Sequence, residues 1–501
     1  MDSQQFREFG KAAVDYIADY LETVEERPVV AGVAPGYLEK LIPEEPPQAG
    51  EKWQEVLQDV DRIIMPGITH WTSPHFHAFF PTASSFPSIV GEMLSAGFGC
   101  VGLSWVASPA YTELEVVMMN WLGKLLGLPE EFLNCSEGPG GGVIQGSASE
   151  TTFVALLAAK EKTVRDIQKL HPELSEAEIK GKLVAYSSNQ SNSSVEKSGL
   201  LGSMPMRLLP VDEKGQLRGD ALEEAIRKDK EQGLIPCYVV ANLGTTPTCA
   251  FDKLEELGPV CQRENVWLHI DAAYAGSAFA CPEYRYLMKG VEYADSFNFN
   301  PHKWMLVNFD CSAMWVRDAR HLVEAFNVER IYLKDQHKGL APEYRHWQIS
   351  LGRRFRALKL WFVLRIYGVD GIQKHIRHQI SLAQRFEELV RGDQRFEVCS
   401  SSMGLVCFKL KGDDALTVKL LERVQQRKKI YVIAGHFGES HVIRFAVCSR
   451  LTEKRHVDYA WNEFASQADE ILGCKVERKS DISIEISNAR CQKINDIEKS
   501  K

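Results

Sequence analysis

The chain has 501 residues, of which 45% are hydrophobic and 25% are charged, and its formal net charge is −8 at pH 7. A net acidic chain lacks the basic excess that nucleic acid phosphates require, so no nucleic acid partner is expected. The apolar runs fall far short of the roughly 20 residues of a membrane span, and the first residues hold no apolar signal-peptide core. We therefore expect a cytoplasmic protein with no membrane association.

The 12 cysteines are scattered along the chain, and none forms a CxxC pair. Several lie inside apolar runs such as DCSAMWV and LVCFKL. Isolated cysteines in apolar runs are typical of buried free thiols in a reducing compartment. The pattern therefore predicts neither a disulfide framework nor a metal site.

The first 24 residues repeat apolar side chains at helical spacing. One helical face would carry Phe6, Phe9, Ala13, Val14, Ile17, Tyr20 and Leu21. The next stretch, RPVVAGVAPGYLEKLIPEEPPQAG, is rich in proline and glycine and predicts an extended connector. Because an apolar stripe needs a surface to cover, we expect residues 1–85 to form a helical arm that packs on a second subunit.

Short strand-like runs recur through the middle of the chain, separated by segments of helical periodicity. They fall at residues 182–188, 206–211, 236–243, 266–273 and 296–300. This alternation predicts an α/β fold with a mostly parallel central sheet and helices on both faces. We assign residues 86–360 to this large domain, and we expect the chemistry at the carboxyl ends of its strands.

The last third has a different pattern. Helical stretches near 357–367 and 375–392 precede the strand-like runs LVCFKL, IYVIAG and VIRFAV and the helical run ALTVKLLERVQQ. This order predicts a small C-terminal α+β domain with an antiparallel sheet, over residues 361–475. Residues 476–501 form a charged tail.

Lys303 stands in the segment SFNFNPHKW, beside His302 and at the end of an apolar strand. Burying a lysine lowers its pKa, and a lysine with a lowered pKa forms Schiff bases with carbonyl compounds. The alternative is a structural lysine that extends its charge to solvent.

Two further segments point to one cofactor. Asp271, in WLHIDAAYAGSA, follows an apolar strand, where its carboxylate could pair with a pyridine nitrogen or cap the next turn. The glycine-rich GPGGGVIQGSASETT leads into a helix, and such a helix N-terminus can bind phosphate. Each signal is weak alone, but a phosphate site, an acid and a lysine together indicate pyridoxal 5'-phosphate.

The chain resembles the aromatic amino acid decarboxylases, a family of pyridoxal-phosphate enzymes, over nearly its whole length. The motifs that carry this resemblance are SWVASPAYTELE, GGGVIQGSASE, LHIDAAYAGSA, SFNFNPHKW and YRHWQISLGRRFR. The resemblance implies an aspartate-aminotransferase-like fold, pyridoxal phosphate as cofactor, an aromatic amino acid as substrate and a homodimer with shared active sites.

The resemblance also implies roles for individual residues. Lys303 matches the lysine that bonds covalently to the cofactor, Asp271 the acid at the pyridine nitrogen, and Tyr332 a tyrosine on a mobile loop that donates a proton. The other cofactor contacts correspond to Ala148, Ser149 and Asn300 at the phosphate, Thr246 at the ring, and His302. Thr82 matches the contact to the substrate carboxylate, surrounded by Trp71, Phe79, Phe80 and Pro81, while Val101 and Leu103 match positions that reach the partner's site.

Asn192 departs from the pattern of the amine-forming members, which carry a histidine after the strand that ends in YSS. A histidine can titrate near neutral pH and relay a proton, whereas an asparagine amide can do neither. Slow protonation leaves an electron-rich carbanion that molecular oxygen can oxidise, which gives an aldehyde, ammonia and hydrogen peroxide. The asparagine resembles the aromatic acetaldehyde synthase branch of the family.

Three alternatives stay open at this point. Asn192 could be drift in an ordinary amine-forming decarboxylase, it could mark an inactive paralogue, or the chain could be a scaffold without cofactor. L-DOPA is the expected substrate, with tyrosine, phenylalanine and tryptophan also open. Phe79 stands where amine-forming relatives often carry tyrosine, which removes a hydroxyl beside the pocket.

Overall fold

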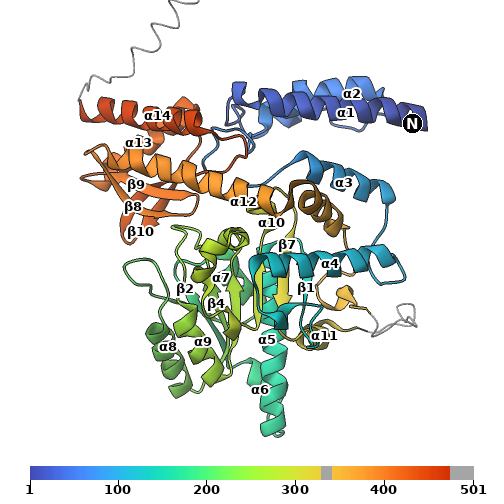
Figure 1. The fold of residues 1–501 in the computed structure, drawn as a ribbon, viewed down its shortest axis with the longest axis vertical. Helices are drawn as coiled ribbons and strands as arrows, with labels where there is room; N and C mark the ends of the chain where they lie inside the picture. The colour runs from blue at the N-terminus through green and yellow to red at the C-terminus, as the bar shows by residue number, and fades with distance from the viewer. Residues whose placement is uncertain (329–340, 474–501) are drawn as a thin grey trace, which may run out of the picture.

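The computed structural model describes residues 1–328 and 341–473, and its centre is a seven-stranded sheet (Figure 1). Of its six strand pairings, four are parallel and two are antiparallel, which confirms the predicted α/β fold with a mostly parallel sheet. The strands lie in the order β1 (Gly141–Gln145), β7 (Ser312–Val316), β6 (Ser296–Phe299), β5 (Trp267–Asp271), β4 (Ile235–Asn242), β2 (Leu183–Ser188) and β3 (Met206–Leu209).

The direction of β1 determines where the helix that follows it begins. β7 is antiparallel to β6, and β1 is antiparallel to β7. Because two successive reversals restore the direction, β1 runs the same way as the parallel strands β2 to β6. The chain after β1 therefore emerges at the same edge of the sheet as the carboxyl ends of those strands.

The five predicted strands correspond to β2, β3, β4, β5 and β6, whereas β1 and β7 were not predicted. β1 begins with two glycines, and glycine usually weakens a strand. Close packing explains the glycine at position 142. A Cβ there would lie 2.6 Å from the Cε of Met119 and 2.8 Å from the ring of Trp315.

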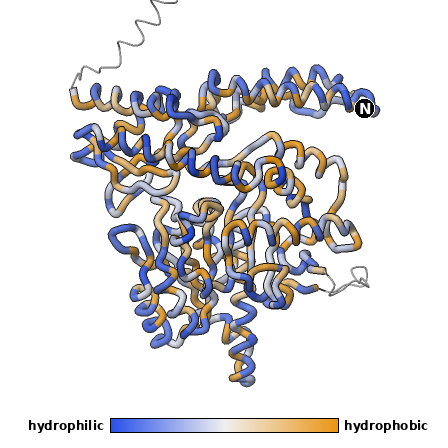
Figure 2. Tube along the Cα trace, in the orientation of Figure 1, coloured by the Kyte–Doolittle hydropathy of each residue, from blue (hydrophilic) through white to orange (hydrophobic). Residues whose placement is uncertain are grey.

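Helices cover both faces of the sheet. Alternate residues of one strand enter different buried clusters: Val184 and Tyr186 belong to one, while Leu183 and Ala185 belong to the other. Figure 2 shows that α6 and α8, at the periphery, are largely hydrophilic. The helices of this part are α3 (Phe86–Phe98), α4 (Pro109–Leu126), α5 (Ala148–Leu170), α6 (Glu176–Lys180), α7 (Ser193–Leu201), α8 (Gly219–Glu231), α9 (Leu254–Glu264), α10 (Pro301–Trp304) and α11 (Arg320–Phe326).

The C-terminal part has its own antiparallel sheet and core, as predicted. The sheet order is β10 (Ile433–Phe437), β11 (Ser440–Ala446), β9 (Leu405–Leu410) and β8 (Phe396–Ser402), covered by α13 (Asp414–Arg427) and α14 (Lys454–Leu472). β8 was not predicted, because its second half is a run of polar residues. Phe386 stacks on Phe445 in the core, with ring centroids 3.7 Å apart.

Helix α12 (Arg356–Arg391) joins the two cores, with a break at Gly368, whose φ is 65°. It contributes Leu360 to the large core and Phe386 to the small one. The domain boundaries at residues 85/86, 360/361 and 475/476 stay predictions, and 360/361 falls inside this helix.

The N-terminal helices α1 (Ser3–Thr23) and α2 (Trp53–Asp59) stand away from the central sheet (Figure 1). They pack on each other through Phe9 and Trp53, whose ring centroids are 5.1 Å apart. Much of the apolar face predicted for α1 is uncovered, since Phe6 is 67% exposed and Val14 is 47% exposed. Within residues 1–328 and 341–473, no helix has the length and apolarity to cross a bilayer.

Helices α3 and α12 make a close contact at Gly91, where a Cβ would lie 2.6 Å from the Cα of Lys359. We expect Gly91→Ala to lower the free energy of unfolding by about 1–3 kcal/mol, because backbone must move to admit the methyl group. Gly97→Ala on the same helix is the control, since nothing lies within 4 Å of its Cβ position. Urea denaturation of the two apoproteins measures the difference, and equal stability would contradict the close packing.

Candidate active site

A cavity of about 610 Å³ holds most of the residues that the sequence assigned to catalysis and substrate binding. It lies at the carboxyl edge of the sheet, because Asn192 follows β2, Thr246 follows β4 and Lys303 follows β6. Its lining consists of Trp71, Phe79, Phe80, Pro81, Thr82, Asn192, Thr246, His302, Lys303, Phe309, Ile433 and Arg444. Of these residues, Phe309, Ile433 and Arg444 were not predicted from the sequence.

Lys303 and Asp271 place opposite charges inside the protein beside this cavity. Asp271 ends β5, and its Oδ1 accepts a hydrogen bond from the backbone N–H of Ala273 at 3.0 Å. Burial raises the pKa of Asp271, and the nearby positive charge of Lys303 opposes this rise. Burial lowers the pKa of Lys303, opposed by Asp271. The lysine is therefore closer to the neutral, nucleophilic form than an exposed lysine is.

His302 is held as a neutral imidazole. Its Nδ1 accepts a hydrogen bond from the backbone N–H of Cys311 at 2.8 Å. Burial, together with the neighbouring charge of Lys303, lowers the pKa of His302 to about 3. A neutral ring that accepts at Nδ1 carries its proton on Nε2, so His302 can donate one hydrogen bond from that nitrogen.

The first turn of α5 offers donors for a phosphate. Ser147 caps the helix, and its hydroxyl accepts from the backbone N–H of Glu150 at 3.2 Å. The N–H groups of Ala148 and Ser149 have no intrahelical partner, as at every helix N-terminus. The Oδ1 of Asn300 accepts a hydrogen bond from the Ser312 hydroxyl at 2.7 Å, which leaves the amide N–H groups of Asn300 as donors.

Both ends of the Asn192 amide are engaged. Asn192 is the N-cap of α7, and its Oδ1 accepts from the backbone N–H of Ser194 at 3.0 Å. Its Nδ2 donates to the hydroxyl oxygen of Thr246, also at 3.0 Å. The side chain thus fixes the helix start and the Thr246 hydroxyl, and it has no proton that titrates near neutral pH.

Stacked aromatic rings form the apolar wall of the cavity. Trp71 stacks on Phe79 with ring centroids 5.3 Å apart. Phe80 stacks on Tyr274 at 3.9 Å, and Tyr274 stacks on Trp304 at 4.8 Å. Such a wall suits a flat aromatic ligand.

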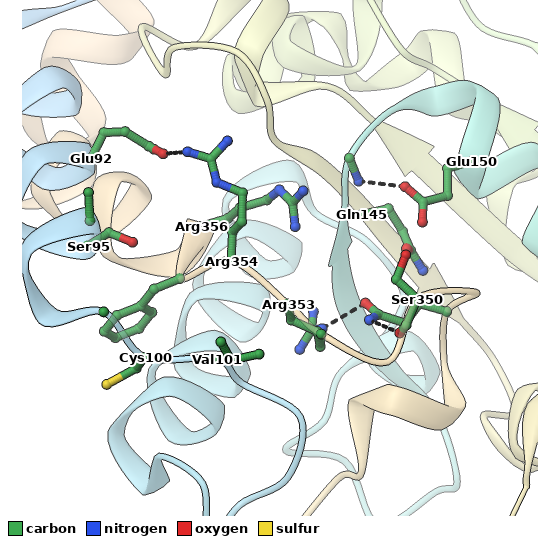
Figure 3. Close-up of a pocket in the computed structure, with 16 residues that line it drawn as sticks. Glu92, Ser95, Cys100, Val101, Gln145, Glu150, Ser350, Arg353, Arg354 and Arg356 are labelled. Atoms are coloured by element: carbon green, nitrogen blue, oxygen red, sulfur yellow. Dashed lines mark hydrogen bonds and ion pairs between the residues drawn. The ribbon is translucent and has the colours of Figure 1, made fainter. Parts of the chain in front are cut away.

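Val101 and Leu103 do not line this cavity. Val101 lines a second one of about 490 Å³, where Figure 3 places it beside Cys100 and near Arg353. Leu103 lines neither. Their assignment to a partner's site stays a prediction. Tyr332 lies outside the described residues.

A family model for the pyridoxal-dependent decarboxylase conserved domain matches residues 35–411. The chain belongs to this family. It is 57% identical to an aromatic-L-amino-acid decarboxylase of Drosophila melanogaster over 472 residues, which are 94% of this chain and 92% of the relative. It is 56% identical to a 3,4-dihydroxyphenylacetaldehyde synthase of Aedes aegypti over 475 residues, 94% of this chain and 91% of the relative.

A solved member of the decarboxylase family shares the fold. The crystal structure of Oryza sativa TDC with PLP and tryptamine superposes with a TM-score of 0.90 at 37% identity, over 94% of this chain and 99% of that one. The present chain thus belongs to the pyridoxal-dependent aromatic amino acid decarboxylase family, whose members similar to it are named both as decarboxylases and as an aldehyde synthase.

The residues present fit pyridoxal phosphate. The buried carboxylate of Asp271, whose pKa is raised, would be stabilised as an anion by a protonated pyridine nitrogen. The buried amine of Lys303 is suited to bond with the aldehyde carbon. The free N–H groups at the start of α5 and the amide of Asn300 are suited to the phosphate.

We expect Lys303→Ala to abolish the visible absorbance band of the lysine-bonded cofactor, because only that band requires the covalent bond to the lysine. The measurement is the visible spectrum of the protein after incubation with pyridoxal phosphate and gel filtration. Lys289→Ala is the matched control, since this lysine is exposed and pairs with Glu255 at 2.7 Å. A Lys303→Ala protein with the spectrum of the parent would contradict the assignment.

Proposed function

We propose that this enzyme is an aromatic acetaldehyde synthase, and that L-DOPA is its substrate. The reaction consumes one molecule each of L-DOPA, oxygen and water and releases 3,4-dihydroxyphenylacetaldehyde, CO2, ammonia and hydrogen peroxide. Asn192 is the observation that carries this proposal, because it replaces the group assigned to proton delivery with an amide that cannot titrate. The 56% identity to an aldehyde synthase supports the proposal.

The chain's own residues orient the substrate. The wall formed by Trp71, Phe79 and Phe80 holds the aromatic ring, and the Thr82 hydroxyl serves the carboxylate. When bound, pyridoxal phosphate takes up the electrons of the bond that breaks at the substrate Cα. Asp271 would hold the pyridine nitrogen in its protonated form, which would favour this uptake of electrons.

The fate of the substrate Cα then distinguishes the two products. Protonation at Cα gives the amine, and it requires a donor that can lose and regain a proton. The Asn192 N–H is bound to the Thr246 hydroxyl and stays on its nitrogen. Without prompt protonation, oxygen accepts two electrons and two protons and becomes hydrogen peroxide. Water then hydrolyses the resulting imine to aldehyde and ammonia.

An ordinary decarboxylase that forms dopamine is the second candidate. The 57% identity to an aromatic-L-amino-acid decarboxylase favours it, and so does the retention of Tyr332, the expected proton donor. It shares the cavity, the cofactor and the release of CO2 with the first candidate, so only product analysis separates the two.

We further propose a homodimer in the cytoplasm. Exposed apolar side chains on α1 and α3 support the dimer, including Phe6, Val14, Phe86, Val90, Met93 and Phe98. In this arrangement Val101 and Leu103 reach the partner's active site. The ten cysteines of the described residues are all free thiols, which supports a reducing compartment.

The decisive comparison is between the parent protein and Asn192→His, each incubated with L-DOPA in air. For the parent we expect aldehyde and hydrogen peroxide in equal amounts. For Asn192→His we expect dopamine to rise at the expense of both, because a histidine can deliver a proton to Cα. Chromatography measures dopamine and aldehyde, and a peroxidase-coupled assay measures peroxide.

Asn189→His is the matched control, since it makes the same substitution at an exposed position of the same loop. Its products should equal those of the parent. Dopamine without stoichiometric peroxide from the parent would overturn the proposal. If Asn192→His gives unchanged products, another residue decides between amine and aldehyde, and Phe79 is the next position to change.

A further inference from the structure

Arg444 reaches from the small domain into the wall of the active-site cavity. It lies on β11, in the middle of the apolar run VIRFAV, and only 3% of its surface is exposed. A buried guanidinium normally pairs with a carboxylate. In residues 1–328 and 341–473 its hydrogen-bond partners are backbone carbonyl oxygens instead.

These carbonyls come from two separate walls of the cavity. The Nε of Arg444 donates to the carbonyl oxygen of Pro247 at 2.9 Å. Its Nη2 donates to the carbonyl oxygens of Thr246 at 2.9 Å and Phe79 at 3.3 Å. The planar fork of arginine can make such divergent bonds at once, whereas the ammonium of lysine is a compact point charge on a flexible chain.

One wall includes Phe79, and the other is the loop whose Thr246 contacts Asn192. Phe79 has a φ of 57°, a left-handed conformation that non-glycine residues rarely adopt. The hydrogen bond from Arg444 to the Phe79 carbonyl oxygen helps to hold this conformation. The hydroxyl oxygen of Thr246 in turn accepts a hydrogen bond from the amide of Asn192. Arg444 therefore connects the aromatic wall with the loop that positions Asn192.

We propose that Arg444 is a positioning residue of this enzyme: its guanidinium fixes the Phe79 wall against the Thr246–Pro247 loop and places a positive charge beside Lys303. The inference rests on the proposed function for its substrate, an aromatic L-amino acid. It deepens that function by naming a group that joins the aromatic wall to the Thr246–Pro247 loop.

Arg444 and Lys303 lie near the same aromatic ring, that of Phe80. The Cζ of Arg444 lies 5.1 Å from the centroid of Phe80, and the Nζ of Lys303 lies 5.6 Å from the same centroid. After burial, this like charge is a further cause that lowers the pKa of Lys303. The other groups that face the lysine are Asp271 on β5, which opposes the effect, and the neutral His302 on α10.

Two variants separate the charge from the bridging bonds. Arg444→Lys keeps the charge but cannot reach all the carbonyls. We expect its KM for L-DOPA, measured by CO2 release, to rise about tenfold with a smaller change in kcat, as the loss of one charge-assisted hydrogen bond implies. Arg444→Gln removes the charge. We expect its apoprotein to show Lys303 reacting with an amine-specific reagent only at a higher pH than the parent, because loss of the like charge raises the pKa of Lys303.

Arg385→Lys, on α12, is the control, because its Nε pairs with Asp458 at 3.1 Å away from the cavity. It should match the parent in both measurements. A parental KM in Arg444→Lys would overturn the bridging role, and an unshifted Lys303 profile in Arg444→Gln would overturn the charge role. CO2 release is common to the amine and aldehyde reactions, and the labelling uses apoprotein, so neither result depends on which product forms.

Discussion

Lys303 and Asp271, which place opposite charges at one edge of the central sheet, are the constraint on which the active site depends. Burying an unpaired charge costs several kcal/mol, and folding must recover this cost elsewhere. The sheet permits it because helices cover both faces and lower the local dielectric constant. The raised pKa of Asp271 and the lowered pKa of Lys303 record the cost. A cofactor with a basic ring nitrogen and an aldehyde would suit both shifts, since it would offer a cation to Asp271 and a carbonyl to Lys303.

The side-chain amide of Asn192, in the same cavity, makes two structural hydrogen bonds. Asn192 caps α7 and positions the Thr246 hydroxyl. Asparagine is among the best N-cap residues, so its presence agrees with the local structure as well as with the proposed chemistry. Arg444 holds the same loop from the opposite side through the Thr246 carbonyl. The loop is thus fixed at its hydroxyl and at its backbone, and neither contact supplies a titrating proton near the substrate.

Much of this site could be predicted from the sequence, because its central residues follow recognisable strands. Lys303, Asp271 and Thr246 each come shortly after an apolar run, and parallel strands bring such positions together. β1 escaped prediction because its glycines resemble a loop, although Gly142 is required by the packing of Met119 and Trp315. Arg444 escaped because its role arises from tertiary contact between two domains, about 200 residues apart along the chain from Thr246. A charged residue inside an apolar strand was the one signal that could have marked it.

The central claim is that oxygen, rather than a proton, receives the electrons left at the substrate Cα. The most direct measurement is the ratio of oxygen consumed to CO2 released by the purified holoenzyme with L-DOPA, followed together in a closed cell with an oxygen electrode and a CO2 sensor, with catalase absent. The account predicts a ratio of one throughout the reaction. Release of CO2 at full rate with no uptake of oxygen would contradict it and would establish an ordinary amine-forming decarboxylase.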